Sequence, residues 1–254
     1  MRSTLGLHTT NAVRKDEGVV SRLNSGKRML TIKAGKRSRL VFLTEPEGLA
    51  VEQYKMLRHR LCTLHPNGGA VLITSPGPGE GKTLTSVNLA WCLADGGDQV
   101  CLVDLDFRAP GVSSAIDSKF EEDGIEDVLN GRRTVAEAIR QIENRSLFVL
   151  GIKRGLASPG RFLSPEVLSP VLENLRTMFQ WVIVDCAPVI PMADVAEIAP
   201  QVDGALMVVR TGKTMKSIIL PALETLGSQL WGVVTNDSPI RGSAYYGYYG
   251  NGKN

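Results

Sequence analysis

The segment TSPGPGEGKT, residues 74–83, decides how this chain folds, and it joins an apolar run to a stretch with helical periodicity. Its glycines let successive backbone N–H groups turn toward phosphate oxygens. Lys82 would neutralise phosphate charge, and the Thr83 hydroxyl would bind Mg²⁺. The usual pattern begins with glycine at position 76, where this chain has Pro76. The segment therefore predicts a nucleotide-binding loop at the start of a helix. The residues predicted to bind the nucleotide are Gly77, Pro78, Gly79, Glu80, Gly81, Lys82, Thr83 and Leu84.

Continuous apolar runs recur along the chain, at 70–75, 99–106, 146–151, 181–188, 204–210 and 230–236. Strands buried on both faces have this pattern, which is typical of a parallel sheet covered by helices. Candidate helices lie between the runs, at 82–95, 125–142, 170–179, 192–199 and 215–227. Ser169 and Pro170 suit the N-cap and first residue of the third of these helices. The alternation predicts one α/β domain over residues 39–237, with a doubly wound, mostly parallel sheet flanked by helices.

Aspartates stand where two of the predicted strands end. Asp104 and Asp106 close the run CLVDLD, and Asp185 closes the run WVIVD. Ligands of open α/β sheets bind at the carboxyl edge of the strands, so these side chains should lie beside the phosphate loop. Three carboxylates near a triphosphate repel it unless a divalent cation lies among them, which indicates Mg²⁺. A single aspartate at a strand end is more often only a turn former.

The composition is that of a globular protein. Of 254 residues, 43% are apolar and 22% are charged, so a full core is available. No apolar run approaches the roughly 18 to 20 residues that cross a bilayer, and the N-terminus has no secretory apolar stretch, so we expect a cytoplasmic protein. The four cysteines lack paired spacing and are predicted to be reduced core thiols: Cys62, Cys92, Cys101 and Cys186.

The two ends of the chain differ from its centre. Residues 1–41 hold ten basic and two acidic residues, whereas the remainder holds nineteen and twenty-four. Residues 1–38 are therefore predicted to be a flexible basic arm, either simply solvated or able to touch an anionic membrane, nucleic acid or an acidic partner. Residues 238–254 are rich in glycine and are predicted to be a flexible tail. This tail holds four of the five tyrosines: Tyr245, Tyr246, Tyr248 and Tyr249.

Taken together, the motifs resemble those of the bacterial tyrosine kinases of the capsule and exopolysaccharide type, a branch of the MinD/ParA-like P-loop ATPases. The resemblance covers about residues 40–249. It rests on the segment 40–61, the phosphate loop, the acidic motif CLVDLDFRAP, the motif VIVDCAP, the stretch GIEDVLNG at 124–131 and the terminal YYGYYG. Any one of these motifs alone would be a weak signal.

The resemblance implies an ATP- and Mg²⁺-dependent kinase that phosphorylates the tyrosines of its own tail in trans. Lys82 would act on the phosphates, and Asp104 would orient and deprotonate the tyrosyl hydroxyl. Asp106 and Asp185 would join Thr83 around the metal. Asn236, at the end of the last strand, would contact the adenine, although an Asn-Asp pair before Ser-Pro is also a simple turn. The phosphoacceptors would be the four tail tyrosines.

The resemblance also implies a ring of subunits, with an interface on the first helix. The family uses a glutamate and two arginines there, and the matching residues are Glu52, Lys55 and Arg58. Lys55 cannot reproduce the bidentate contact of an arginine, and a solvent-facing charged stripe is the alternative. A separate transmembrane adaptor would hold the protein at the inner face of the membrane, where the arm could touch anionic lipid.

Two other functions fit the same nucleotide site. A positioning ATPase of the MinD/ParA kind would carry a signature lysine where this chain has Gly77, and membrane binding of the MinD kind needs a terminal amphipathic helix that YYGYYGNGKN cannot form. DNA binding through the basic arm is disfavoured but stays open. The second alternative is a scaffold without catalysis, whose assembly ATP controls.

Overall fold

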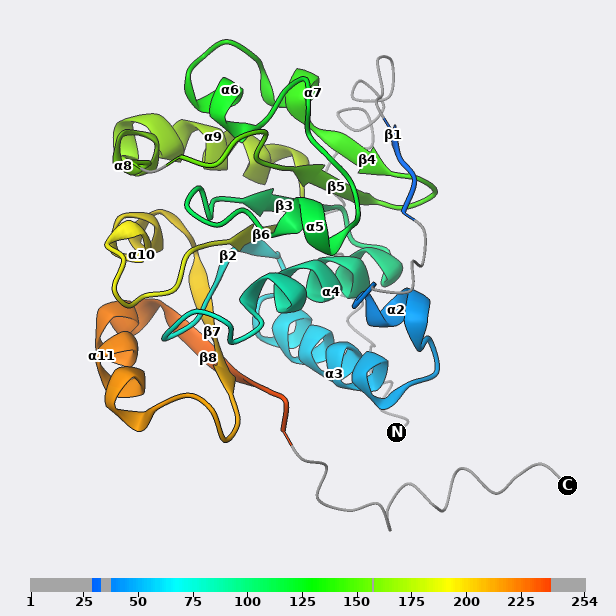
Figure 1. The fold of residues 1–254 in the computed structure, drawn as a ribbon. Coiled ribbons are helices and arrows are strands. Elements are labelled where there is room, and N and C mark those ends of the chain that lie inside the picture. Colours follow the sequence, from blue (N-terminus) through cyan, green and yellow to red (C-terminus); the bar gives the residue numbers. More distant parts are fainter. Residues whose placement is uncertain (1–28, 33–37, 157, 239–254) are drawn as a thin grey trace, which may run out of the picture.

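An eight-stranded sheet forms the centre of the computed structural model, which describes residues 29–32, 38–156 and 158–238. The strand order is β1-β4-β5-β3-β6-β2-β7-β8 (Figure 1). The strands are β1 (Met29–Leu30), β2 (Gly69–Thr74), β3 (Val100–Asp104), β4 (Arg140–Ile142), β5 (Leu147–Leu150), β6 (Trp181–Asp185), β7 (Gly204–Arg210) and β8 (Leu230–Asn236). Every neighbouring pair is parallel except β4 with β5. The prediction of a mostly parallel α/β sheet is confirmed.

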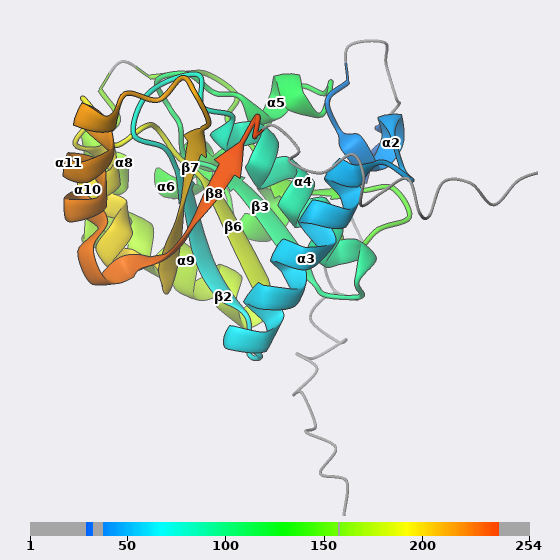
Figure 2. The ribbon, with the colours of Figure 1, turned by 90° about the horizontal axis from the view of Figure 1, so that it is seen from below.

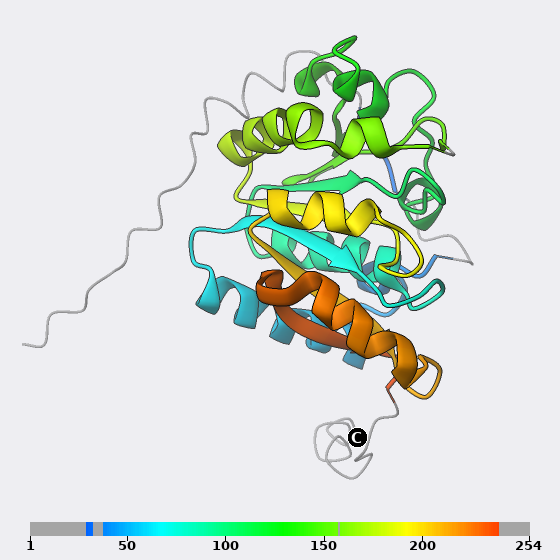
Figure 3. The ribbon, with the colours of Figure 1, turned by 90° about the vertical axis from the view of Figure 1, so that its left-hand side faces the viewer.

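Helices cover both faces of the sheet (Figure 2). One face carries α2 (Val41–Thr44), α3 (Leu49–Leu64), α4 (Lys82–Asp95) and α5 (Val112–Ala115). The other face carries α6 (Ile125–Leu129), α7 (Val135–Ala138), α8 (Gly160–Leu163), α9 (Pro165–Met178), α10 (Asp194–Ile198) and α11 (Lys216–Leu226). Figure 3 looks onto the second face, where α9, α10 and α11 lie side by side. Short 3₁₀ turns follow α10 at Ala199–Gln201 and α11 at Gly227–Gln229.

The core has two halves, one on each face of the sheet. Helix α9 shows how the sequence builds one of them, because Leu168, Leu172, Leu175 and Met178 recur every three or four residues and are all buried. Helix α4 builds the other half and is buried from Thr85 to Ala94, since it lies between the sheet and α3. The strands between the two halves are continuous apolar runs, as expected for a sheet that is covered twice.

A polar side chain inside α4 anchors the start of the domain. The Asn88 amide accepts a hydrogen bond from the Val41 N–H at 2.9 Å and donates to the carbonyls of Arg39 and Leu84 at 3.2 and 2.8 Å. Asn88 is 1% exposed, so these bonds satisfy an amide that would otherwise be buried without partners. The segment before α3 is thereby fixed onto the helix that follows the phosphate loop.

Two predicted helices were placed wrongly. The span 125–142 is not one helix but α6, α7 and the strand β4, because Gly131 takes φ +70° and Thr134 starts a new helix with a capping box to Glu137. The helix predicted from 170 begins earlier, at Pro165, which occupies the first position. Pro170 lies inside the helix.

The predicted arm and tail lie mostly outside the described residues. Within the arm, Met29 and Leu30 pair in parallel with Gln141 and Ile142, so part of it belongs to the sheet. All four cysteines are free thiols; Cys92, Cys101 and Cys186 are buried in the core, whereas Cys62 is only partly buried. In the part of the chain that the structure describes, no helix is long and apolar enough to cross a membrane.

Candidate nucleotide and phosphoryl-transfer site

The phosphate loop connects β2 to α4 at the carboxyl edge of the sheet. Gly79 and Gly81 take φ +77° and +96°, conformations that favour glycine, and Gly81 caps α4. Pro76 has a negative φ, so the departure from the usual glycine is compatible with this backbone. The Ser75 hydroxyl donates to the Gly77 carbonyl at 2.7 Å. The sequence thus forms the expected loop at the N-terminus of a long helix.

Glu80, one of the residues predicted to bind the nucleotide, has a side chain that stabilises the loop. Its carboxylate is 6% exposed and accepts hydrogen bonds from the Arg210 N–H at 2.7 Å and from the Thr214 hydroxyl. The Asn236 amide donates to the Glu80 carbonyl at 2.9 Å and leaves no room for a side chain at Gly81. The ends of β7 and β8 therefore hold the phosphate loop in place.

The strand register brings the three predicted aspartates together. Asp104 of β3 pairs with Asp185 of β6, and Asp185 pairs with Ile73 of β2, just before the loop. The Lys82 ammonium lies 2.5 Å from an Asp106 carboxylate oxygen. Burial acts to lower the pKa of Lys82, but the charges of Asp185 and Asp106 raise it above the ordinary value. Lys82 is therefore held protonated among carboxylates.

Asp104 organises the loop that follows β3. Its two oxygens accept hydrogen bonds from the Asp106 N–H at 3.0 Å and the Val112 N–H at 3.1 Å. Burial, followed by the charge of Asp185, raises the pKa of Asp104 well above its usual value. A buried carboxyl with such a high proton affinity is suited to accept a proton, since each oxygen keeps a second lone pair.

Asp185 has one oxygen in use and one free. Its Oδ1 accepts a hydrogen bond from the Ser86 hydroxyl at 3.0 Å. Its Oδ2 is buried without a hydrogen bond of good geometry, although the Thr83 hydroxyl is close enough to act to lower the pKa of Asp185. Burial raises the pKa of Asp185 to about 6, against the opposing charge of Lys82. A buried carboxylate oxygen without a partner suits a hard cation such as Mg²⁺.

The protein alone does not complete a metal site. Among the described residues, no group of three His, Cys, Asp or Glu side chains could hold a metal ion. Mg²⁺ usually binds through one or two protein oxygens and completes its shell with phosphate oxygens and water. The Asp185 carboxylate, with the Thr83 hydroxyl at the start of α4, therefore fits Mg²⁺ that arrives with a nucleotide.

An ion pair fixes the acidic motif to the other face of the sheet. The Arg108 guanidinium contacts both oxygens of Asp194, at the start of α10, at 2.9 and 3.1 Å. Asp194 is 4% exposed, so its carboxylate is buried and needs this partner, whereas Arg108 is partly exposed. It holds the loop that carries Asp106.

The residues predicted for the ring interface differ in their contacts. Lys55 and Glu52 form an exposed pair at 2.7 Å on α3. Arg58 donates to the Gly96 carbonyl at 3.0 Å and lies 3.7 Å from Asp98, so it contacts its own subunit. The four tail tyrosines lie outside the described residues.

Sequence reasoning missed Ser86 and Thr214, which position Asp185 and Glu80. Ser86 had a visible signal, because it follows Lys82 by four residues on the same helix face. Thr214 had none, since its contact joins residues 134 positions apart.

A phosphate loop at a β2–α4 junction, with aspartates at two neighbouring strand ends, defines a P-loop ATPase. A family model described as AAA domain matches residues 71–210. Tyrosine-protein kinase YwqD of Bacillus subtilis is 31% identical over 240 residues, or 92% of this chain and 97% of its own length. Tyrosine-protein kinase CpsD of Streptococcus pneumoniae is 33% identical, over 71% of this chain and 82% of its own. The chain belongs to the bacterial tyrosine kinase family and is a protein-tyrosine kinase.

Other similar proteins extend this comparison. The succinoglycan biosynthesis transport protein ExoP of Rhizobium meliloti is 32% identical over 67% of this chain but only 22% of its own length. The solved BceF tyrosine kinase domain has a TM-score of 0.71 at 25% identity and covers 89% of this chain and 99% of its own. MinD of Pyrococcus horikoshii, solved with Mg-ADP, shares the fold, with a TM-score of 0.55 at 19% identity over 70% of this chain and 76% of its own.

Proposed function

We propose that the kinase domain, residues 39–237, binds MgATP and transfers its γ-phosphoryl group to tyrosines 245, 246, 248 and 249 of a neighbouring copy. The observation that carries this proposal is the protonated Lys82 beside a buried cluster of aspartates at the end of the phosphate loop. Phosphoryl transfer needs positioned positive charge and a carboxylate near the acceptor more than covalent chemistry, and this edge of the sheet supplies both.

Each residue has a distinct part in the transfer. The loop N–H groups from Gly77 to Leu84 hold the phosphates, and Lys82 exchanges Asp106 for phosphate oxygens. Thr83, Asp185 and Asp106 would hold Mg²⁺, which neutralises charge on the phosphates. Asp104 takes the proton of the phenol, whose free pKa is near 10, as the phenolic oxygen bonds to the γ-phosphorus and the bond to ADP breaks. Asn236 lies beside the loop and would contact the adenine.

The tail is long enough to reach another subunit. About ten residues separate Ser238 from Tyr248, so an extended tail spans roughly 35 Å. We infer a ring in which the α3 pair Glu52–Lys55 faces a neighbour. Arg58 joins this interface only by giving up its contacts with Gly96 and Asp98. The tyrosine available within the domain, Tyr54, is a poor acceptor, because burial raises its pKa.

The cellular role follows from the relatives. ExoP is named for succinoglycan biosynthesis and is much longer than this chain. We propose that this kinase regulates the synthesis and export of an extracellular polysaccharide and works with a separate transmembrane adaptor. The protein would then act at the inner face of the membrane, with the basic arm on anionic lipid.

Transfer in trans is tested by mixing two inactive variants. Lys82→Met keeps the acceptor tail, and a chain with Phe at the four tail positions keeps the nucleotide site. We expect phosphotyrosine only in the mixture with MgATP, on the Lys82→Met chain, which a size tag identifies. A silent mixture beside an active unmodified chain would show transfer within one subunit. ADP production without phosphotyrosine in the unmodified chain would instead favour an ATPase or scaffold.

A further inference from the structure

A cleft with a volume of about 680 Å³ lies outside the phosphoryl-transfer site. It lies between α6, α8 and the segment that follows β5. Its lining is Glu121, Glu126, Asn130, Arg132, Lys153, Arg154, Leu156, Arg161 and Phe162. None of these residues has a part in the transfer described above. Four of them are basic and two are acidic. We call it the basic cleft.

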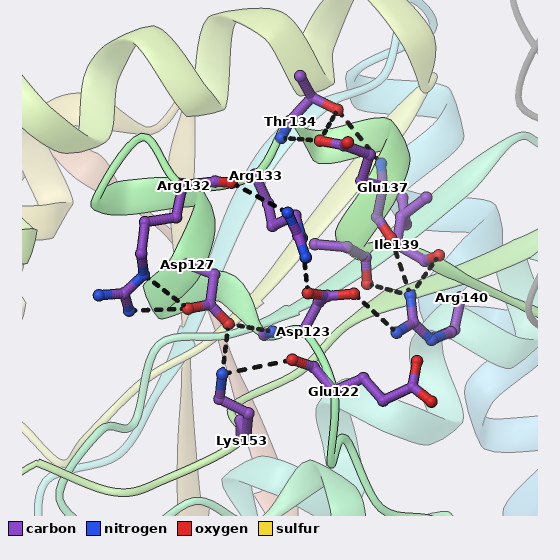
Figure 4. A network of polar contacts seen from close by, with 12 residues as sticks. Glu122, Asp123, Asp127, Arg132, Arg133, Thr134, Glu137, Ile139, Arg140 and Lys153 are labelled. Atoms are coloured by element: carbon purple, nitrogen blue, oxygen red, sulfur yellow. Dashed lines mark hydrogen bonds and ion pairs between the residues drawn. The ribbon is translucent and has the colours of Figure 1, made fainter.

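Two acids line the basic cleft: Glu121 is exposed and lies 3.8 Å from Lys119, whereas Glu126 is held by backbone N–H groups. Both carboxylate oxygens of Glu126 accept the Lys153 N–H, at 3.1 and 3.3 Å, and one also accepts the Arg154 N–H at 3.0 Å. Behind the lining, Arg132 and Lys153 share Asp127, each at 2.7 Å (Figure 4). Burial opposes these contacts, but the two cations hold the pKa of Asp127 at about 2, so the carboxylate stays charged.

Two arginines at the basic cleft remain available to an anion. Neither Arg154 nor Arg161 forms an ion pair with any residue that the structure describes. The Arg161 guanidinium lies 4.5 Å from the centre of the Phe162 ring and donates to the Asn130 side chain at 3.1 Å. Guanidinium groups bind phosphate through two parallel hydrogen bonds, so both side chains have the chemistry to receive an anion.

The base of the cleft is apolar. Phe162 is 4% exposed, and Leu156 packs at the edge of the core beside it. The Arg161 guanidinium covers the Phe162 ring and Phe107 stacks on it, so the apolar surface that a ligand can contact is mainly the partly buried Leu156. An apolar surface beside two arginines favours a ligand that carries a phosphate on an aromatic ring, because the ring can pack on it while the phosphate meets the guanidinium groups. A bare phosphate would leave the apolar base unused.

The basic cleft is joined to the acidic motif of the catalytic site. The Leu156 N–H donates to the Phe107 carbonyl at 2.7 Å, and the Phe107 and Phe162 rings stack with centroids 5.7 Å apart. Phe107 directly follows Asp106. A ligand in the cleft would therefore lie close to the place where phosphotyrosine is produced.

We propose that the basic cleft binds a phosphotyrosine of the C-terminal tail and so holds the product away from the nucleotide. The proposal rests on the proposed function, which supplies the phosphorylated tail. The length of the tail permits it: β8 and β5 are five strand spacings apart, about 24 Å, while an extended chain from Ser238 to Tyr249 spans about 36 Å. The tail of a neighbouring copy has the same reach.

Binding can be measured without kinase activity. The receptor is the full chain with its four tail tyrosines changed to Phe, and the probe is a fluorescent peptide SAYYGYYGNGKN phosphorylated at the second tyrosine. Fluorescence anisotropy compares it with the unphosphorylated peptide and with a peptide carrying phosphoserine at that position. The variants are Arg154→Gln and Arg161→Gln, and the control is Arg60→Gln, which removes an exposed arginine from α3.

We expect the phosphotyrosine peptide to bind at least about tenfold more tightly than both comparison peptides. Arg154→Gln and Arg161→Gln should each weaken it about tenfold or more, as expected from losing a hydrogen bond to a charged group, while Arg60→Gln leaves it unchanged. Equal binding of the phosphoserine peptide, equal weakening by Arg60→Gln, or no binding would each overturn the proposal. The result does not depend on transfer, so a failed kinase assay leaves it intact.

Discussion

Replacing Glu80 by alanine tests whether contacts with the end of β7 stabilise the phosphate loop. The Glu80 carboxylate accepts hydrogen bonds from the Arg210 N–H at 2.7 Å and from the Thr214 hydroxyl. A hydrogen bond to a charged group contributes about 1.5 to 3 kcal/mol. Thr214 keeps its bonds with the Arg210 backbone at 2.9 and 3.0 Å, so the loss should be nearer one such bond than two.

We therefore expect Glu80→Ala to lower the free energy of unfolding by about 2 to 3 kcal/mol. For a domain of this size, that loss shifts Tm by about 4 to 12 °C. Glu80→Gln keeps one acceptor oxygen and should cost less. The affinity for a fluorescent ADP analogue should fall more in Glu80→Ala than in Glu80→Gln, because the loop loses the hydrogen bonds of the Glu80 carboxylate.

The assay is urea unfolding, with Glu173→Ala as the matched control, because Glu173 is exposed on α9. The control should change stability by no more than about 0.5 kcal/mol. If Glu80→Ala unfolds at the same urea concentration as the control, the carboxylate contributes nothing and the reasoning is refuted.

Four further substitutions and treatments have defined outcomes. Asp185→Asn should weaken Mg²⁺-dependent ADP binding about tenfold or more while Mg²⁺-free binding changes less; equal losses would contradict a metal contact. Leu172→Ala should lower the free energy of unfolding by about 2 to 4 kcal/mol in urea, and a loss below about 1 kcal/mol would contradict full burial. Arg108→Gln should lower the urea midpoint in the same assay, because the buried Asp194 loses this partner, and an unchanged midpoint would contradict this role. In thiol titration of the folded protein, Cys62 should react first, and faster labelling of Cys101 would contradict the core.

The fold could be predicted because its main signals are local. Continuous apolar runs at β2, β3, β6 and β7 are typical of strands covered on both faces, and their shortness favours strands over buried helices. Asp104 and Asp185 could be placed together because parallel strands end at one edge of a sheet. The glycines of the phosphate loop predicted where α4 begins, at Lys82. For these features the sequence pattern and the tertiary structure agree.

The helix errors also have physical causes. Between Ile125 and Ile142 the apolar residues keep a helical spacing, which hides two interruptions. Gly131 and the capping box of Thr134 with Glu137 mark the break, and both signals are present in the sequence. The start of α9 was missed because two Ser-Pro pairs lie five residues apart, and the pair at 164 and 165, not the one at 169 and 170, starts the helix.

Long-range polar contacts could not be predicted in the same way. Glu80 and Asn236 were predicted to bind the nucleotide, which stays a prediction. The hydrogen bond from the Arg210 N–H to the Glu80 carboxylate and the bond from Asn236 to the Glu80 carbonyl had no signal in the sequence. Arg58 was predicted at a subunit interface, which stays a prediction, and its hydrogen bond to Gly96 at the end of α4 had no signal in the sequence. Such side chains choose between a ligand, a neighbour and their own subunit, and sequence spacing does not distinguish these partners.

The central claim is that Lys82 and the aspartates around it hold MgATP for attack by a tail tyrosine. The most direct measurement is mass spectrometry of the full chain after incubation with Mg²⁺ and ATP, with Lys82→Met as the control. Phosphate should appear on tyrosines between 245 and 249 in the unmodified chain and on none of them in the variant. Phosphate found on Tyr54 instead, or equal tail phosphorylation in the Lys82→Met chain, would contradict the account.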